Sequence, residues 1–135
     1  MNNVLRKTVL IIYGLFFFIG AKAQQAQVSP VEDIVSAMRN SNTSTIAKYF
    51  DNIVPITINN TQSIYSRTQA EMVLKDFFNK NMPKDLTIIN SGAPNNTSRF
   101  AIGDLTTSNG KYSIYILLRA KDNVFLLQEI RFNKE

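Results

Sequence analysis

The sequence contains no cysteine and no histidine among its 135 residues. Without cysteine there is no disulfide framework, no thiolate nucleophile, no zinc–thiolate site and no lipid attached through an N-terminal cysteine. Without histidine the chain lacks the commonest general base and the commonest metal ligand, so Ser-His and Cys-His relays are excluded. These two absences narrow the possible chemistry more than any residue that is present.

The charge of the chain excludes further classes. The formal net charge is +5, but Arg6, Lys7 and Lys22 lie in a segment that we expect to be removed. Without these three, 12 of the 15 Lys and Arg residues remain against 10 Asp and Glu residues, and no basic run indicates nucleic-acid binding. No Asp-x-Asp-x-Asp-Gly calcium loop occurs either. The sequence therefore predicts no metal, no cofactor and no nucleic-acid partner.

Residues 1–23 have the three parts of a secretory signal peptide. Arg6 and Lys7 give a positive start, Val9–Ile19 is an apolar run, and Ala21-Lys22-Ala23 offers small residues for cleavage. The apolar run is too short to span a bilayer comfortably, so we favour a cleaved leader over a retained anchor.

Cleavage after Ala23 would leave a secreted or periplasmic protein with no membrane attachment. Residues 24–28 are polar apart from Ala26 and Val28, and we expect a flexible lead-in there. The remaining residues, 29–135, have the length of one domain.

Three helices are predicted in the first two thirds of the domain. Ser29 caps the first, which should end near Asn40, and a short helix follows Asn42. The third is the clearest, because two overlapping capping boxes, Ser66 with Gln69 and Thr68 with Glu71, precede an apolar face. The side chains of that face recur at helical spacing: Ala70, Val73, Leu74, Phe77 and Phe78.

Strands are predicted on either side of the third helix. Ile53–Asn59 is a strand candidate in which Ile56 and Ile58 alternate with polar residues. Pro55 cannot donate to a ladder, which favours an edge or bulged strand. Asn59–Ser63 reads as a polar loop, Leu86–Ile89 as a strand and Ser91–Asn96 as a turn or loop.

The last third of the chain predicts a three-stranded antiparallel meander over Arg99–Phe132. Asn109-Gly110 between two β-rich runs is the strongest short-range hairpin signal. A three-residue turn at Lys121–Asn123 would make one face of the meander almost wholly apolar, whereas a two-residue turn would exchange the two faces of the last strand. We favour the three-residue turn. A bare meander needs a cover, and the third helix is the best candidate.

The order of elements indicates an α+β fold with helices on one face of an antiparallel sheet. It resembles the nuclear-transport-factor-2-like, or cystatin-like, fold, a cone in which a strongly bent sheet wraps a long helix. Together with the leader, the chain resembles a family of small secreted bacterial proteins of uncharacterised function. The resemblance rests on Gln69-Ala70-Glu71-x-x-Leu74-x-x-Phe77-Phe78, Ala101-Ile102-Gly103-x-Leu105-Thr106-Thr107-x-Asn109-Gly110 and Tyr115-x-Leu117-Leu118.

That resemblance implies a fold and no activity. Ketosteroid-isomerase-like and dehydratase-like proteins of similar fold place acids, tyrosines or histidines inside the cone. No positions here match the isomerase motif of a base carboxylate with a Tyr/Asp oxyanion pair, and fold analogy alone does not license an activity.

Three polar side chains fall on the predicted inner face of the meander: Tyr112, Gln128 and Thr107. A few polar groups in an apolar concavity are typical of small-ligand sites, so these three are candidates for lining a pocket. The alternative, which we favour, is that each simply finds a hydrogen-bond partner at the mouth of the cone.

The predicted outer face carries two features. Asp104, Tyr115 and Glu129 would form a row in which two carboxylates act as acid and base if one were desolvated, although a solvated row is the simpler interpretation. The face also carries apolar side chains, which suggests a homodimer packed sheet to sheet. The candidates for that interface are Phe100, Ile102, Leu117, Phe125 and Leu127.

Two functions remain open on this evidence. The first, which we favour, is a secreted or periplasmic binding or interaction domain without catalysis and with an unknown ligand. The alternative is a small-molecule isomerase or dehydratase that uses Asp104, Glu129 or a tyrosine inside the cone.

Overall fold

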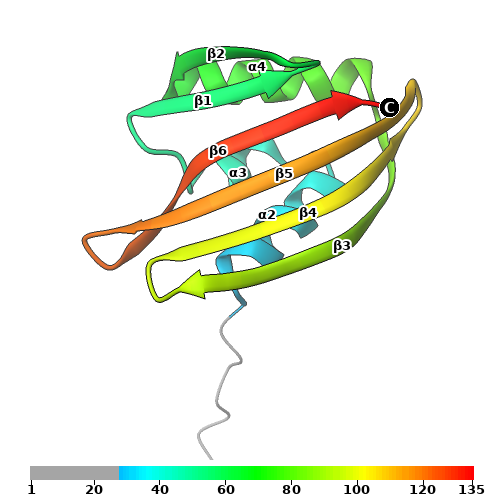
Figure 1. Ribbon diagram of the computed structural model, residues 1–135. Coiled ribbons are helices and arrows are strands. Elements are labelled where there is room, and N and C mark those ends of the chain that lie inside the picture. The colour runs from blue at the N-terminus through cyan, green and yellow to red at the C-terminus, as the bar shows by residue number, and fades with distance from the viewer. Residues whose placement is uncertain (1–27) are drawn as a thin grey trace, which may run out of the picture.

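The computed structural model describes residues 28–135, so the predicted leader and nearly all of the lead-in lie outside the described residues. Figure 1 shows a curved sheet with the helices behind it. No helix within the described range is long and apolar enough to cross a membrane. The helices are α2 (Pro30–Arg39), α3 (Thr43–Ala47) and α4 (Arg67–Lys80). The strands are β1 (Ile53–Ile58), β2 (Thr61–Ser66), β3 (Pro83–Asn95), β4 (Ser98–Thr107), β5 (Gly110–Lys121) and β6 (Val124–Lys134).

The helices begin at the capping residues that the sequence predicts. The backbone N–H of Glu32 donates to the Ser29 hydroxyl at 3.2 Å, and Asn42 accepts in the same way at the start of α3. At α4 the box is reciprocal, because the Gln69 N–H donates to the Ser66 hydroxyl while the Ser66 N–H donates to the Gln69 side chain. The three predicted helices are confirmed.

The strand order is β2-β1-β6-β5-β4-β3, and every neighbouring pair is antiparallel except β1 with β6. The predicted edge position of β1 is therefore wrong. β1 joins β6 only from Ile56 to Ile58, so Pro55 lies beyond that ladder and its missing N–H costs no bond to β6.

A strand was missed where the sequence predicted a polar loop. Asn59 and Asn60 both have positive φ, 50° and 64°, and close a two-residue turn that returns the chain as β2. Asparagine tolerates this left-handed conformation, so the pair makes a hairpin despite the polar residues that follow. β3 is likewise longer than predicted and contains most of the expected loop at 91–96, with three bulges against β4.

The turn between β5 and β6 has two residues, so the favoured three-residue turn is wrong. Asp122 and Asn123 have φ of 51° and 63°, which is the type I′ geometry. A bulge between the pairs Leu117↔Glu129 and Leu118↔Leu127 then leaves Gln128 without a partner in the ladder. Because the turn is one residue shorter than predicted, the residues of β6 before Gln128 point to the opposite face from the one predicted. The bulge at Gln128 reverses this again, so the residues after it lie on the predicted faces.

The core lies between the inner face of the sheet and the helices, with α4 against β1 and β2 and α2 against β3 and β4. Four aromatic rings meet where α4 ends, and Phe77 packs against Phe132 with the rings tilted by 33° and their centroids 4.4 Å apart. Phe78 and Tyr112 complete this group in edge-on contacts. Each fully buried ring or leucine of this kind contributes about 1.5–3 kcal/mol of transfer free energy. The predicted cover of the meander by the third helix is therefore only partly right, because α4 lies against β1 and β2 and reaches β5 and β6 with Phe77, whereas α2 lies against β4.

Candidate functional site

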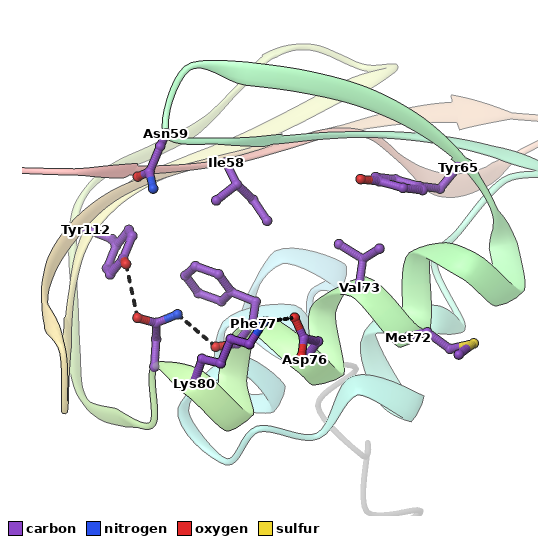
Figure 2. A pocket seen from close by; sticks show the side chains of 10 residues that line it. Ile58, Asn59, Tyr65, Met72, Val73, Asp76, Phe77, Lys80 and Tyr112 are labelled. Atoms are coloured by element: carbon purple, nitrogen blue, oxygen red, sulfur yellow. Dashed lines mark hydrogen bonds and ion pairs between the residues drawn. The ribbon is translucent and has the colours of Figure 1, made fainter.

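A pocket of about 500 Å³ opens between α4 and the β1–β2 hairpin. Figure 2 shows Ile58 and Tyr65 of the hairpin above it and Val73 and Phe77 of α4 below it. Its walls are therefore apolar apart from the Tyr65 hydroxyl, which points into the pocket, and its other polar groups lie at the rim and the floor. The full lining is Ile58, Asn59, Tyr65, Met72, Val73, Asp76, Phe77, Lys80, Asn81 and Tyr112.

The local sequence explains why these side chains converge. On α4, Ala70, Leu74 and Phe78 are buried against the sheet. Val73, which directly precedes Leu74, lies at the side of this buried face and points toward the hairpin. On β2 alternate residues face opposite sides, so Tyr65 points inward over the pocket while Ile64 points outward. The pocket is the space that a 14-residue helix leaves under a short hairpin.

The floor of the pocket is formed by side chains that are linked to one another by hydrogen bonds. The Tyr112 hydroxyl donates to Asn81 Oδ1 at 3.0 Å, and Asn81 Nδ2 donates to the Phe77 carbonyl at 3.0 Å. Both side chains are almost fully buried, with 4% and 7% of their surface exposed. The chain satisfies the polar atoms that burial would otherwise leave unpaired. Tyr112 thus borders the pocket and also has an internal hydrogen-bond partner, as the simpler interpretation requires.

The rim carries one positive and one negative side chain, whose charges cancel. Lys80 Nζ lies 2.9 Å from Asp76 Oδ2, one helical turn away, and both side chains are more than 60% exposed. Such a pair is worth only about 0–1 kcal/mol in water. Asn59 Oδ1 accepts the N–H of Lys134 at 3.1 Å. No Asp or Glu among residues 28–135 is buried, and no group of three potential metal ligands occurs there.

Two of the three predicted pocket residues do not line this pocket. The Thr107 hydroxyl donates to the Gly110 carbonyl at 2.7 Å and accepts the Asn109 N–H at 3.1 Å, so it stabilises the β4–β5 turn. Gln128 is exposed at the bulge, because the two-residue turn removes it from the inner face. It borders a separate hollow of about 220 Å³ beside Asp51 and Lys121.

The predicted acidic row lies on the outer face and not inside the cone. Asp104 faces Thr87 and Ser113, and Tyr115 lies between Ile102 and Arg131. There is no direct row of two carboxylates and a tyrosine.

Arg131 contacts both Glu129 and Tyr115 on that outer face. Its guanidinium pairs with Glu129 and lies 5.1 Å from the centre of the Tyr115 ring. The hydrogen bond with Glu129 raises the pKa of Arg131 above its ordinary value. Glu129 is therefore committed to a structural ion pair on the surface.

The apolar residues of the outer face are fewer than predicted. Phe100, Ile102 and Leu117 are half-buried there, and Phe100 pairs directly with Leu117. Leu127, with 1% exposure, belongs to the core, and Phe125 packs against the same core. Their predicted outer position is wrong, because the turn before them is one residue shorter than expected.

The main site residues were missed by sequence reasoning. Tyr65 lies between the predicted loop at Asn59–Ser63 and the predicted third helix, where the sequence assigns no element, and Asn81 is predicted only as a helix stop. The Asn59-Asn60 pair was the available signal, since two residues that tolerate positive φ predict a tight hairpin. Met72, Asp76 and Lys80 lie outside the apolar face of α4, so nothing in the periodicity marked them.

One titrating pair lies away from the pocket and holds the helical cover together. The Tyr49 hydroxyl, just after α3, donates to Asp33 Oδ2 on α2 at 2.6 Å. Burial, together with the hydrogen bond and the charge of Asp33, raises the pKa of Tyr49 to about 12. At neutral pH this pair acts as a fixed structural bond.

Comparison with known proteins agrees with this architecture. Residues 31–133 match a family model described as Domain of unknown function (DUF4783). No match is found among the curated proteins. The chain is similar to the crystal structure of a DUF4783 family protein from Bacteroides uniformis, with 24% identity and a TM-score of 0.75 over 79% of this chain and 98% of that one. A DUF4783 family protein from Bacteroides fragilis is 28% identical, with a TM-score of 0.72 over 81% of this chain and 100% of that one.

More distant structures share the fold alone. An NTF-2 like protein of unknown function from Silicibacter pomeroyi is 9% identical, with a TM-score of 0.58 over 78% of this chain and 89% of that one. A domain with a cystatin-like fold from Nostoc punctiforme has the same TM-score and identity, over 78% of this chain and 72% of that one. The predicted fold, a bent sheet around a long helix with nuclear-transport-factor-2-like and cystatin-like neighbours, is confirmed.

Proposed function

Since the chain belongs to the DUF4783 family, whose function its description leaves unknown, we propose from the site itself that it is an exported, non-catalytic binding domain. The observation that carries the proposal is the pocket under the β1–β2 hairpin, which has apolar walls and a polar floor whose hydrogen bonds are already made. A pocket of this size falls within the range of small-ligand sites.

The lining indicates what kind of molecule fits. Ile58, Val73 and Phe77 offer apolar contact, so the ligand needs an apolar body. Asp76 and Lys80 lie at the rim, where the solvent competes for their charges, so a polar group of the ligand can remain there without being desolvated. The ligand of this proposal is therefore amphipathic and enters with its apolar end first.

The arrangement supports binding more than catalysis. General acid–base chemistry needs a group whose pKa is shifted toward the working pH, usually by burial. The carboxylate at the pocket, Asp76, is exposed and ion-paired, and the hydroxyl of Tyr112 is engaged by Asn81. The acids of the alternative isomerase or dehydratase function, Asp104 and Glu129, are on the other face of the sheet. We therefore retain the binding function.

Export is supported by the leader pattern of residues 1–23. Expression with the full N-terminus in a bacterial host, followed by fractionation and N-terminal sequencing, tests it. Protein recovered outside the cytoplasm and starting at Gln24 is the expected result. Protein that keeps residues 1–23 would contradict export.

The binding function is tested with anilinonaphthalene sulfonate, a fluorescent probe with apolar rings and one charged group. We expect it to bind the folded protein and to shift the NMR signals of Tyr65, Val73 and Phe77. Val73→Trp fills the pocket and should weaken binding by about tenfold or more. Lys75→Trp adds the same ring to α4 away from the pocket lining and should leave binding unchanged. Binding that ignores Val73→Trp, or no binding at all, would overturn the pocket as the site.

A further inference from the structure

The two edges of the sheet differ in how they are protected against other chains. An unpaired edge presents free N–H and C=O groups, which natural proteins block with bulges, prolines or charges. β3 has all three: it is bulged at three places, contains Pro83 and Pro94, and carries Lys84 and Asp85. β2 has none of them, since Thr61–Ser66 contains no proline and no charge and pairs with β1 without a register shift.

The register identifies the free groups of β2. In a hairpin with a two-residue turn, the residues that flank the turn exchange both hydrogen bonds, and the pattern then alternates. Ile58 and Thr61 flank the Asn59–Asn60 turn, so Ser63 and Tyr65 also bond to β1. The N–H and C=O groups of Gln62 and Ile64 therefore point away from the sheet. Within residues 28–135 no main-chain hydrogen bond from another element reaches these two residues.

The pocket opens beside this edge. Tyr65 belongs to β2 itself, and Met72 and Val73 lie across from it on α4, as Figure 2 shows. A strand added along β2 would lie on its side away from β1, with α4 on the inner side of the sheet there. Its alternate side chains would point to the inner side, as Tyr65 does, and so toward the pocket. Ile64 and Met72, which are 68% and 66% exposed, would flank such a strand on its two sides.

We propose that the natural occupant of this site is an extended, uncharged segment of another polypeptide, which adds to β2 as a further strand and places one apolar side chain in the pocket. This names the ligand of the proposed binding function and rests on it. Strand addition uses main-chain hydrogen bonds for affinity and a side-chain pocket for specificity, and both parts are present here.

The chemistry of the segment follows from its surroundings. β2 carries no charge that would attract a charged residue, and a charge at the inward position of the added strand would lose its water between the pocket walls. The apolar pocket walls require an aliphatic or aromatic side chain at the inward position. A second folded copy is a poorer occupant. α4 runs along the same edge as β2 in Figure 1, so two-fold pairing of β2 strands would bring two α4 helices together at that edge.

The probe for this proposal is a short capped peptide in which threonine alternates with valine, with phenylalanine at the centre. Two N-methylated forms are made, one methylated on the valine and phenylalanine amides and one on the threonine amides. In an added strand only one of these two sets faces β2. We expect one form to lose about tenfold or more in affinity and the other to bind nearly as the parent does. Equal binding of both forms, or no binding of the parent peptide, would overturn strand addition.

A pair of protein variants tests the same edge. Ile64→Pro removes an outward N–H that β1 does not use, and we expect it to weaken peptide binding by about fivefold or more. Ile89→Pro is its matched control, because Ile89 is an equally exposed isoleucine at a bulge of the opposite edge, where proline is tolerated. Should Ile64→Pro fail to fold, the two N-methylated peptides still decide the question on the unaltered protein.

The outcomes separate this inference from the proposed function. Val73→Trp should weaken both the peptide and anilinonaphthalene sulfonate, whereas Ile64→Pro should weaken the peptide alone. If the dye binds normally but the peptide does not, the pocket takes a small molecule and strand addition is wrong. If neither binds, both proposals fail. A concentration-dependent dimer that Ile64→Pro abolishes would make a second copy the occupant and would also overturn the inference.

Discussion

Both faces of the sheet carry apolar side chains on β4 and β5, but the two faces differ in how far these side chains are buried. On the inner face of β4 and β5, Leu105, Ile114, Ile116 and Leu118 have no exposed surface, because three helices cover them. On the outer face Phe100, Ile102 and Leu117 are only half-buried and cover one another across the strands. Both faces contain isoleucine and leucine, so the presence of apolar residues alone does not show which face is covered.

This difference shows that coverage, and not composition, decides what a residue contributes. A leucine under a helix leaves a cavity when it is truncated, whereas a leucine beside solvent leaves a space that water fills. Polar groups follow the same rule. Tyr112 on the inner face needs Asn81, while Tyr115 on the outer face has its ring against Arg131 and needs no buried partner. The predictions below test this contrast.

The largest effect is expected from two adjacent leucines of β5 that face opposite ways. Leu118→Ala removes a fully buried side chain and should lower the free energy of unfolding by about 2–5 kcal/mol. Leu117→Ala, its neighbour on the outer face, should cost about 1 kcal/mol or less. Urea denaturation followed by circular dichroism measures both. Equal losses would show that the outer face is as well covered as the inner one.

Two tyrosines of β5 provide the next contrast. Tyr112→Phe leaves the buried Oδ1 of Asn81 without its donor and should cost about 1–3 kcal/mol. Tyr115→Phe keeps the ring against Arg131 and should change the free energy of unfolding by no more than about 0.5 kcal/mol. The same urea titrations measure the pair. A neutral Tyr112→Phe would mean that water replaces the hydroxyl at the pocket floor.

A smaller effect depends on pH and concerns the cover of the inner face. The pKa of Tyr49 is raised from 10.0 to about 12, because burial and Asp33 disfavour the tyrosinate in the folded state. Its contribution to stability is therefore complete below pH 10 and is lost as the pH rises toward 12. The denaturation midpoint should fall more steeply over that range in the wild type than in Tyr49→Phe. Parallel pH profiles would contradict the shift.

The smallest effect on folding is expected on the outer face, where we propose that the apolar residues mediate a homodimer. Ile102→Glu should change the free energy of unfolding of the monomer by about 0.5 kcal/mol or less, yet abolish association. Light scattering at several protein concentrations measures the mass. Met72→Glu on α4, which covers the other face of the sheet, is the control and should leave the dimer intact. A wild-type protein that is monomeric at every concentration would make this face ordinary surface.

Local signals in the sequence predicted most of the elements. The capping residues Ser29 and Ser66 and the spacing of Leu74 and Phe78 predicted the helices, and Asn109-Gly110 predicted the central hairpin. These signals act within a few residues, so a single sequence contains them.

The faces of β6 and the pocket were not predicted, because both depend on distant parts of the chain. Asp122-Asn123 permits a two-residue turn, but only the fit of Ile130 and Phe132 to the core reveals the bulge that follows it. The pocket needs β2 to lie over α4, and β2 was read as a loop because its residues are mostly polar. Asn81 was found as a helix stop, while its partner Tyr112 lies 31 residues further along the chain.

The unpaired Gln128 has an evolutionary consequence. It compensates for the short turn at Asp122-Asn123, so that Ile130 and Phe132 still reach the core. A one-residue insertion in that turn or a deletion at Gln128 would each reverse part of the strand, while both together would preserve it. In homologous chains, an insertion in the turn should therefore occur together with a deletion at the bulge. A change at only one of the two places should be rare.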